Sequence, residues 1–277
     1  MRFAAELLAT LDRAYAGREV PRVQALHLPP VPWAGTRDGE FGAVELDSGA
    51  LGLSYVLLDD TLATIGQAGA AVRGASALEV ARWWAEGSGA RAALGFAAVN
   101  ALTRELFDRA RFVPPAATDS IGGIDPQPGE HIGMVGFFPP LVKQVTAHGA
   151  RLTVLELRAD LAGAREGFRI TLDPAELASC TQVLSTSTVL LNHTLDEVLA
   201  ACRSARRIAL VGPGAGCLPD GLFDRGVTLL GGTWVVDPRA FTQALAAGSP
   251  WGGATRKFAL TREAYPGLPS LLATLGS

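Results

Sequence analysis

Cysteine is scarce in this sequence. Three cysteines occur among 277 residues, Cys180, Cys202 and Cys217, and no two of them form a C-x-x-C pair. Such sparse, odd-numbered usage is not a disulfide framework and is typical of proteins that stay reduced. We therefore expect a cytoplasmic protein.

An excess of one charge is also missing. The chain has 24 Lys and Arg against 27 Asp and Glu, a net charge of −3, and its basic residues form no cluster. This balance predicts no nucleic-acid partner and no attraction to an anionic membrane. Hydrophobic residues make up 48% of the chain and charged ones 18%, which predicts a folded protein with a sizeable core.

Long apolar runs are the third absence. No stretch reaches the roughly 18 apolar residues that a membrane-spanning helix needs. Glu6 and Asp12 interrupt the apolar pattern of the N-terminus, where a signal peptide would have an unbroken apolar core. The sequence therefore predicts neither a membrane span nor a signal peptide.

The first 115 residues predict a small α+β domain. Apolar residues recur at helical spacing over 2–16, a strand follows over 22–28, and Asp47-Ser48-Gly49 is the turn of a β-hairpin. Two helices come next. The first begins at the capping box Ser76-Ala77-Leu78-Glu79, and the second, 90–107, is rich in Gly and Ala, which allow close packing at the centre of the domain.

Residues 116–130 are rich in Pro and Gly and predict a linker to a second domain over 131–250. Strands and helices alternate in that domain, which predicts a doubly wound parallel sheet with helices on both faces. The predicted strands cover 131–137, 151–157, 182–187, 207–212 and 227–235. The predicted helices cover 139–148, 174–180, 194–203, 219–225 and 238–248. Residues 251–277 form a C-terminal tail with a last strand and a helix.

Ligands of doubly wound sheets bind at the carboxyl ends of the strands, where the strand order reverses. If the predicted strands are ordered 3-2-1-4-5, the loops after the first and fourth strands face each other. These loops are GFFPP (136–140) and GPGAGCLPDG (212–221). We therefore expect the ligand site between them.

The loop after the first strand is only partly compatible with a dinucleotide. Glu156 follows Gly136 by 20 residues, the spacing at which an acidic residue meets a ribose hydroxyl. However, the loop has one glycine where the dinucleotide motif has three, and Pro139 and Pro140 lack the N–H groups that a pyrophosphate needs. NAD(P) binding of the standard kind is therefore disfavoured, and the alternative for Glu156 is a solvated carboxylate at a strand end.

Several other residues could carry chemistry, each with a structural alternative. Gly212, Gly214 and Gly216 form either a nest of N–H groups for an anion or a flexible turn. Hydroxyl groups crowd the end of the third strand, and we expect at least one of them to bind a ligand; they are Ser185, Thr186, Ser187 and Thr188.

Histidine, cysteine and asparagine add three single candidates. His193 is the histidine best placed for chemistry and a candidate metal ligand, and Cys217 is either a second metal ligand or an inert core residue. No metal-site spacing and no G-x-S-x-G elbow occur. Asn100 stands among apolar helix residues, so it is either a structural amide or a group that faces the inter-domain cleft.

Four segments, in this order, resemble the Rossmann-like domain of the putative heavy-metal-chelation family: VGFFPPLV, VLELRAD, LSTSTVLLNHTLDEVL and LVGPGAGCLPDGLFDRGVTLLGG. The preceding ALEVARWWAEGSGARAALGFAAVNAL is similar to the small domain of that family, which has an enolase N-terminal-like fold. Together these matches cover most of residues 40–235. The resemblance implies a two-domain α/β protein with its ligand site in the cleft between the domains.

The resemblance also implies which residues line that cleft. They are Gly136, Phe137, Phe138, Pro139, Thr186, Ser187, Thr188, Asn192, Thr194, Gly212, Pro213, Gly214 and, from the small domain, Asn100. The chain departs from the family pattern at His193, where a small residue is expected, and at Gly214, where serine is expected. Without that serine hydroxyl, position 214 has no side-chain ligand or donor to offer.

These features predict a cytoplasmic protein that binds a small anionic or metal-chelating molecule in the inter-domain cleft, in heavy-metal chelation or chelator metabolism. A transition metal or a metal complex is the expected cofactor. A nucleotide- or S-adenosylmethionine-dependent enzyme and a non-catalytic regulator or scaffold are the alternatives. The apolar composition and the Trp-rich helices are compatible with a homodimer.

Overall fold

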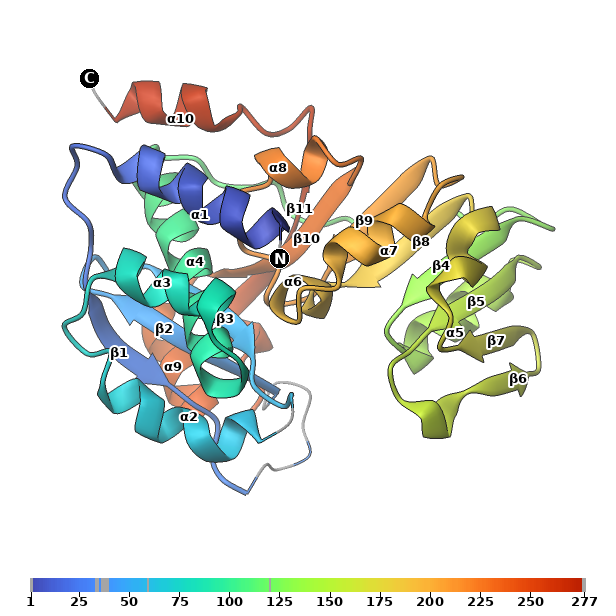
Figure 1. Ribbon diagram of the computed structural model, residues 1–277, viewed down its shortest axis with the longest axis horizontal. Coiled ribbons are helices and arrows are strands. Elements are labelled where there is room, and N and C mark those ends of the chain that lie inside the picture. The colour runs from blue at the N-terminus through green and yellow to red at the C-terminus, as the bar shows by residue number, and fades with distance from the viewer. Residues whose placement is uncertain (1, 33–34, 36–39, 59, 120, 276–277) are drawn as a thin grey trace.

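The computed structural model describes residues 2–32, 35, 40–58, 60–119 and 121–275 and divides their strands between two sheets (Figure 1). The small sheet is antiparallel, with the order β1-β2-β3, and the large sheet has the order β11-β10-β9-β8-β4-β5-β7-β6. The strands are β1 (Val23–His27), β2 (Phe41–Leu46), β3 (Leu51–Tyr55), β4 (His131–Val135), β5 (Arg151–Leu155), β6 (Gly163–Arg165), β7 (Phe168–Thr171), β8 (Gln182–Thr186), β9 (Arg207–Val211), β10 (Leu229–Val235) and β11 (Thr255–Thr261).

Helices surround both sheets (Figure 1). The α-helices are α1 (Arg2–Tyr15), α2 (Thr61–Ala70), α3 (Ala77–Glu86), α4 (Gly89–Arg109), α5 (Pro139–Thr146), α6 (Thr188–Leu191), α7 (Leu195–Ala201), α8 (Asp220–Phe223), α9 (Pro238–Ala246) and α10 (Leu268–Thr274). The short 3-10 helices are η2 (Ala159–Leu161), η3 (Pro174–Ser179) and η4 (Gly252–Ala254). None of the helices in the described ranges is both long enough and apolar enough to cross a membrane.

Helix α4 is the centre of the N-terminal half, as its Gly- and Ala-rich sequence predicts. It is buried along most of its length. A Cβ on Gly95 would lie 2.1 Å from the Trp84 backbone nitrogen, and a Cβ on Gly52 would lie 2.1 Å from that of Ala101. Glycine is therefore required at both positions, because only it lets α3 and β3 approach α4 this closely.

The local signals for turns and helix starts have mixed outcomes. The predicted hairpin joins β2 and β3, with Gly49 in the left-handed region at φ 85°. Helices α3 and α7 start directly after Ser76 and Thr194, as the capping boxes predict, but neither side chain makes the capping hydrogen bond. Asp173 does cap η3, since its carboxylate accepts the Ala175 N–H at 2.9 Å.

The large sheet is doubly wound, as predicted, with antiparallel strands at both edges. Six strands run parallel, and in chain order from β4 their spatial order is 3-2-1-4-5-6. Strands β6 and β7 were not predicted from the sequence, and β7 takes the place beside β5. The neighbour of β4 is therefore β8. The prediction that the β4 and β9 loops face each other across the strand-order reversal is wrong by one strand.

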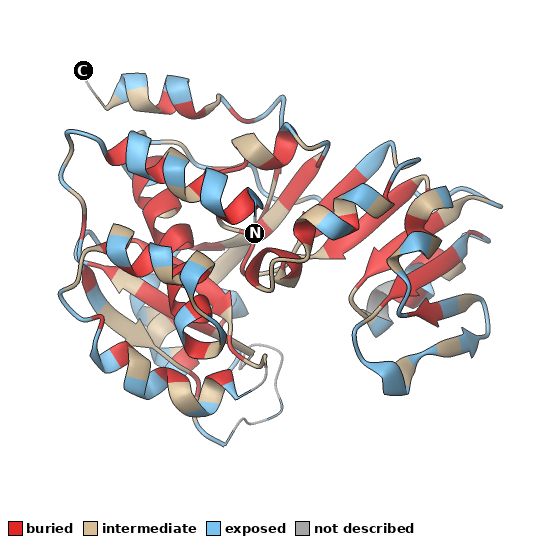
Figure 2. Ribbon diagram, viewed as in Figure 1, coloured by how far each residue is buried: buried red, intermediate tan, exposed pale blue. Residues whose placement is uncertain are grey.

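Both faces of the large sheet are covered. On one face Ile132, Met134 and Val154 pack against α5. Ile121 and Ile124 join the same cluster and are 5% and 4% exposed. This part of the predicted linker is therefore packed onto the sheet. Figure 2 shows the central strands buried, whereas the β6 end of the sheet is largely exposed.

The N-terminal and C-terminal halves share apolar cores. One cluster joins α1, α3 and α4 to the large sheet. Another joins the small sheet, through Leu51 and Leu53, to Phe241 and Leu245 of α9. The residues predicted as a tail supply β11, the edge strand of the large sheet. The two halves are consequently in direct contact, and β3 lies beside the loop that follows β9.

Candidate functional site

The loop after β4 is built around its own hydrogen bonds. The Gly136 N–H donates to the Leu155 carbonyl at 2.8 Å, and the Phe137 N–H donates to Glu156 Oε2 at 2.9 Å. Pro139 starts α5 and has no N–H. This loop has little left with which to hold a pyrophosphate, in agreement with the sequence argument against a standard dinucleotide site.

The two phenylalanines of this loop differ in their surroundings. The Phe137 ring stacks on Phe168 of β7, with centroids 6.1 Å apart and planes at 21°. Phe138 lies beside Gly136, where its Cε2 atom would be 3.5 Å from an added Cβ. Both rings are half-buried and pack against the apolar cluster under α5. Their role in the described structure is packing at the edge of the strand-end region.

Glu156 joins the ends of β4 and β5. Besides the Phe137 N–H, its carboxylate accepts the Leu157 N–H at 2.8 Å and the Arg158 N–H at 3.4 Å through Oε1. Both oxygens therefore accept hydrogen bonds from backbone groups, whereas a ribose-binding carboxylate would have oxygens available for the ribose hydroxyls. The spacing of 20 residues from Gly136 reflects this clamp between neighbouring strands.

The crowded hydroxyls after β8 separate into bonded and unbonded groups. Thr186 Oγ1 and Thr188 Oγ1 lie 3.0 Å apart, and Ser185 Oγ donates to the Thr186 carbonyl at 3.2 Å. Ser187 is only 5% exposed, and its hydroxyl bonds to no other described residue. A Cβ on Gly212 would lie 2.4 Å from Ser187 Oγ. Ser187 is thus the hydroxyl of this group that remains available to a ligand, and it faces the β9 loop.

The sequence allows two alternatives for the glycine-rich loop after β9, a three-glycine nest and a flexible turn, and the N–H groups of this loop are used unequally. The Gly212 N–H continues the sheet by donating to the Gly231 carbonyl at 2.9 Å, and the Ala215 N–H closes a turn onto the Gly212 carbonyl. The N–H groups of Gly214 and Gly216 have no partner among the described residues. Pro213 lies between Gly212 and Gly214 and has no N–H to offer. Two donors therefore remain, whereas a nest of all three glycines would supply three.

Asn100 connects the N-terminal half to this loop. Its Nδ2 donates to the Leu53 carbonyl at 2.8 Å and to the Gly214 carbonyl at 2.9 Å. These two bonds fix the orientation of the amide and give Asn100 the structural role that was one of its alternatives. Its Oδ1, however, is buried in a residue that is 3% exposed and has no hydrogen-bond partner in the part of the chain that the structure describes. Such a group costs on the order of 1–3 kcal/mol, so Oδ1 points to a donor supplied from outside these residues.

Five residues therefore form what we call the strand-end site. They are Asn100, Ser187, Gly212, Gly214 and Gly216. Its free groups are one amide oxygen, one hydroxyl and two backbone N–H groups. An acceptor beside several donors suits a small polar molecule with both carboxylate and N–H or O–H groups.

Residues 192–194 lie outside this set and hold two helices together. Thr194 Oγ1 donates to Asn192 Oδ1 at 2.7 Å. His193 Nε2 donates to the Trp84 carbonyl at 2.9 Å, and its ring stacks on Trp84 with centroids 5.5 Å apart. Burial lowers the pKa of His193. These residues fasten the connection between α6 and α7 to α3.

The two proposed metal ligands do not make a metal centre. Cys217 is 1% exposed, and burial raises the pKa of its thiol to about 12, whereas a metal needs the thiolate. His193 uses Nε2 for the Trp84 carbonyl. Within the described ranges, no three His, Cys, Asp or Glu side chains are grouped so as to hold a metal ion. Heavy metals prefer thiolate and imidazole ligands. A buried, protonated thiol and a histidine whose Nε2 is already hydrogen-bonded do not fit a directly coordinated heavy metal.

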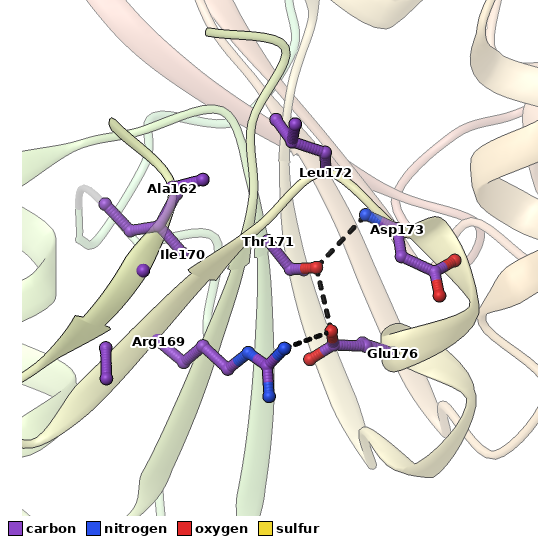
Figure 3. A pocket seen from close by; sticks show the side chains of 9 residues that line it. Ala162, Arg169, Ile170, Thr171, Leu172, Asp173 and Glu176 are labelled. Atoms are coloured by element: carbon purple, nitrogen blue, oxygen red, sulfur yellow. Dashed lines mark hydrogen bonds and ion pairs between the residues drawn. The ribbon is translucent and has the colours of Figure 1, made fainter. Parts of the chain in front are cut away.

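A groove of about 450 Å³ lies elsewhere, between β6, β7 and η3 (Figure 3). Its polar side chains bond to one another. Glu176 Oε1 accepts Arg169 Nη2 and Thr171 Oγ1, each at 2.9 Å. Unlike the strand-end site, this groove has no buried side-chain polar atom without a partner in the part of the chain that the structure describes.

Sequence reasoning missed the contribution of β3 to this region. The Leu53 carbonyl shares the Asn100 amide, and Tyr55 ends the strand two residues later. Neither residue belongs to a motif, since a backbone carbonyl and a lone strand tyrosine leave no local pattern. Only the fold brings β3 to the strand ends of the large sheet.

Comparisons with known proteins agree on one family. A family model described as "Putative heavy-metal chelation" matches residues 121–263, slightly more than half of the chain. A second model with the same description matches residues 40–103. No match was found among curated proteins.

Two solved structures of proteins of unknown function from the family of the first model share the fold. One, from Desulfitobacterium hafniense, is 21% identical with a TM-score of 0.68, over 92% of this chain and 98% of the other. One from Pyrococcus horikoshii is 19% identical with a TM-score of 0.69, over 94% and 99%. At this identity the likeness concerns the two-sheet α/β fold alone.

Proposed function

This chain belongs to the putative heavy-metal-chelation family, and we propose that its strand-end site binds a small organic metal chelator, free or loaded with its metal. One observation supports this most directly: Asn100 Oδ1 is a buried acceptor with no donor among the described residues, and its amide is held in place by the bonds of Nδ2 to two backbone carbonyls. A bound molecule with an N–H or O–H group would supply that donor.

The other free groups of the site suit the remainder of such a molecule. The Gly214 and Gly216 N–H groups are donors for a carboxylate, and the Ser187 hydroxyl either donates or accepts. Carboxylate, hydroxyl and amine groups are also the groups with which small chelators hold metals. The metal is then cargo coordinated by the chelator, and the protein recognises the organic part.

Thermal melting tests this proposal with defined probes. Citrate and iminodiacetate, each free and as its nickel complex, are compared with nickel chloride alone. A chelator at one hundred times its Kd stabilises a protein by about 2.7 kcal/mol, which is readily measured. We expect stabilisation by a chelator or its complex and none by nickel chloride at the same concentration.

A pair of serine variants locates the binding. Ser187→Ala removes one hydrogen-bonding group, so we expect chelator affinity to fall about tenfold. Ser204→Ala, at an exposed serine away from the site, is the matched control and should bind as the wild type does. Stabilisation by nickel alone, or equal chelator affinity in both variants, would contradict the proposal.

A further inference from the structure

Gly214 is a glycine that neither its backbone conformation nor close packing explains. Gly212 has a φ of 146°, and its Cβ would lie 2.4 Å from Ser187 Oγ. A Cβ on Gly216 would press on the Asn100 side chain at 3.3 Å. In contrast, the φ of Gly214 lies outside the left-handed region, and the nearest atom beyond its chain neighbours would be 3.6 Å from its Cβ, an ordinary contact. A side chain would therefore fit at position 214, and its absence leaves room.

Three atoms border the position that a Gly214 side chain would take. An added Cβ would lie 3.6 Å from Ser187 Oγ, 3.7 Å from Phe96 Cε1 and 3.8 Å from the Leu53 carbonyl oxygen. We call the space between these atoms and Gly214 the Gly214 subsite. It lies within the strand-end site, and Gly214, Ser187 and Phe96 are all buried. Glycine is the residue that lets a ligand approach the backbone closely, because no Cβ stands between them.

The Gly214 subsite suits a neutral hydroxyl group. The Ser187 hydroxyl bonds to no other described residue, and the Leu53 carbonyl accepts one bond, from Asn100 Nδ2, and has a second lone pair. The same Asn100 amide carries the unpartnered Oδ1, so a second acceptor lies next to the carbonyl. A ligand hydroxyl would donate to one of these acceptors and accept from Ser187.

A charged group suits this subsite less well. The three atoms that border it are a hydroxyl oxygen, a carbonyl oxygen and a ring carbon, and none of them is ionised. An ammonium group would therefore be buried without an opposite charge among these atoms, which costs more than burying a hydrogen-bonded hydroxyl. A carboxylate would meet two oxygens there, of which only the Ser187 hydroxyl can donate to it.

The carboxylate has its donors on the backbone beside the subsite. The N–H groups of Gly214 and Gly216 have no partner among the described residues. Since one of these N–H groups and the subsite belong to the same residue, the ligand groups that occupy them lie within a few bonds of each other. A hydroxyl and a carboxylate on one carbon atom, as in an α-hydroxycarboxylate, meet this requirement.

We infer that Gly214 makes the strand-end site selective for an α-hydroxycarboxylate chelator, with its hydroxyl in the Gly214 subsite and its carboxylate on the N–H groups of the β9 loop. This inference rests on the proposed function and names the chemical class of the ligand and the residue that selects it. Gly214 acts through the absence of a side chain, so one added methyl group tests its role.

Citrate and tricarballylate test this inference because they differ only in the hydroxyl on the central carbon, which citrate has and tricarballylate lacks. Isothermal titration calorimetry at pH 7 measures both affinities. We expect citrate to bind the wild type at least tenfold more tightly, because a site that hydrogen-bonds a hydroxyl rejects the analogue without it. Gly214→Ala fills the subsite with a methyl group, so it should weaken citrate about tenfold, leave tricarballylate unchanged and bring the ratio of affinities toward one.

Two measurements show whether Gly214→Ala acts locally. Its midpoint of urea unfolding should be no lower than that of the wild type, because alanine fits the conformation and the contacts at this position. Gly66→Ala is the matched control, at an exposed glycine of α2 whose added Cβ would have no neighbour within 4 Å outside its own stretch of helix. This control should preserve the preference for citrate. A Gly214→Ala protein that fails to fold would overturn the inference, because packing would then require the glycine.

The remaining outcomes separate the inference from the proposed function. If the wild type binds citrate and tricarballylate equally, or if the preference survives in Gly214→Ala, the site binds chelators but the inference is wrong. The inference is also wrong if iminodiacetate binds and citrate does not. If neither citrate, iminodiacetate nor their nickel complexes bind the wild type, the proposed function fails and the inference falls with it.

Discussion

Replacing His193 by alanine and by glycine separates the cost of its backbone conformation from the worth of its side-chain contacts. His193 has a φ of 61°, in the left-handed region that non-glycine residues occupy at a cost of roughly 1–2 kcal/mol. Its side chain offsets this cost through the hydrogen bond to the Trp84 carbonyl and the stacking on the Trp84 ring.

The two variants should differ in stability by the backbone term. Both variants lose one hydrogen bond and one ring contact, and each of these two contacts is worth about 1 kcal/mol. Alanine keeps the left-handed strain, so His193→Ala should lower the free energy of unfolding by about 2 kcal/mol. Glycine adopts this conformation without strain, so His193→Gly should lose only about 1 kcal/mol.

Urea unfolding measures both variants, with Trp fluorescence and circular dichroism as independent probes. The predicted order of stability is wild type, then His193→Gly, then His193→Ala. If the glycine variant were equal to or less stable than the alanine variant, the left-handed strain at His193 would be refuted. If both variants matched the wild type, the contacts with Trp84 would contribute nothing.

Three further predictions concern acid stability, close packing and thiol reactivity. Burial would raise the pKa of Glu130, but hydrogen bonds from Thr181 and Arg206 outweigh it and lower the pKa to about 2 from an ordinary 4.5. The ionised carboxylate contributes on the order of 2 kcal/mol to the free energy of unfolding above pH 4.5, and this contribution is lost as the pH falls toward 2. Glu130→Gln should therefore melt at a lower temperature than the wild type at pH 7, and the two melting temperatures should converge in acid. Gly212→Ala places a Cβ 2.4 Å from Ser187 Oγ and should lower the free energy of unfolding in urea by roughly 1–3 kcal/mol. Adding Ser187→Ala should restore part of that stability. A double variant with no restored stability would contradict the clash. The three cysteines are buried, and burial raises the pKa of Cys202 to about 11 and the pKa values of Cys180 and Cys217 to about 12. A thiol reagent at pH 8 should therefore label none of them in the native protein and all three in denaturant. Rapid labelling of the native protein would refute this.

Apolar periodicity was sufficient to predict most of the large sheet. Its long parallel strands are near-continuous apolar runs, and the helices between them carry recognisable starts. Strands β6 and β7 escaped prediction because they have only three and four residues in a segment rich in charge and glycine. That omission displaced the numbering of every later strand and with it the predicted position of the strand-order reversal.

The site could be predicted as a region but not as a set of free groups. The sequence places hydroxyls after β8 and glycines after β9, yet only the fold shows that Thr186 and Thr188 bond to each other while Ser187 does not. Asn100 and Gly214 are 114 residues apart, and no local pattern reports their contact. Partners at such separations are decided by tertiary packing, which a periodicity argument does not contain.

The aromatic pair after β4 illustrates the same limit. Its position at a strand end indicates a wall of the cleft, and its prolines argue against a phosphate loop. The side-chain direction of Phe137 depends on β7, the strand that the sequence did not reveal. Likewise the Leu53 carbonyl belongs to no motif, and only the packing of β3 beside the loop after β9 brings it to Asn100.

Native mass spectrometry of the protein purified without added chelators would detect a ligand that co-purifies with it. We expect wild-type protein to carry a small organic molecule, with or without a metal, and we expect the adduct to be reduced in Ser187→Ala but retained in Ser204→Ala. A wild-type spectrum that shows only a bare metal ion, or an organic adduct equally abundant in both serine variants, would contradict a chelator bound at the strand-end site.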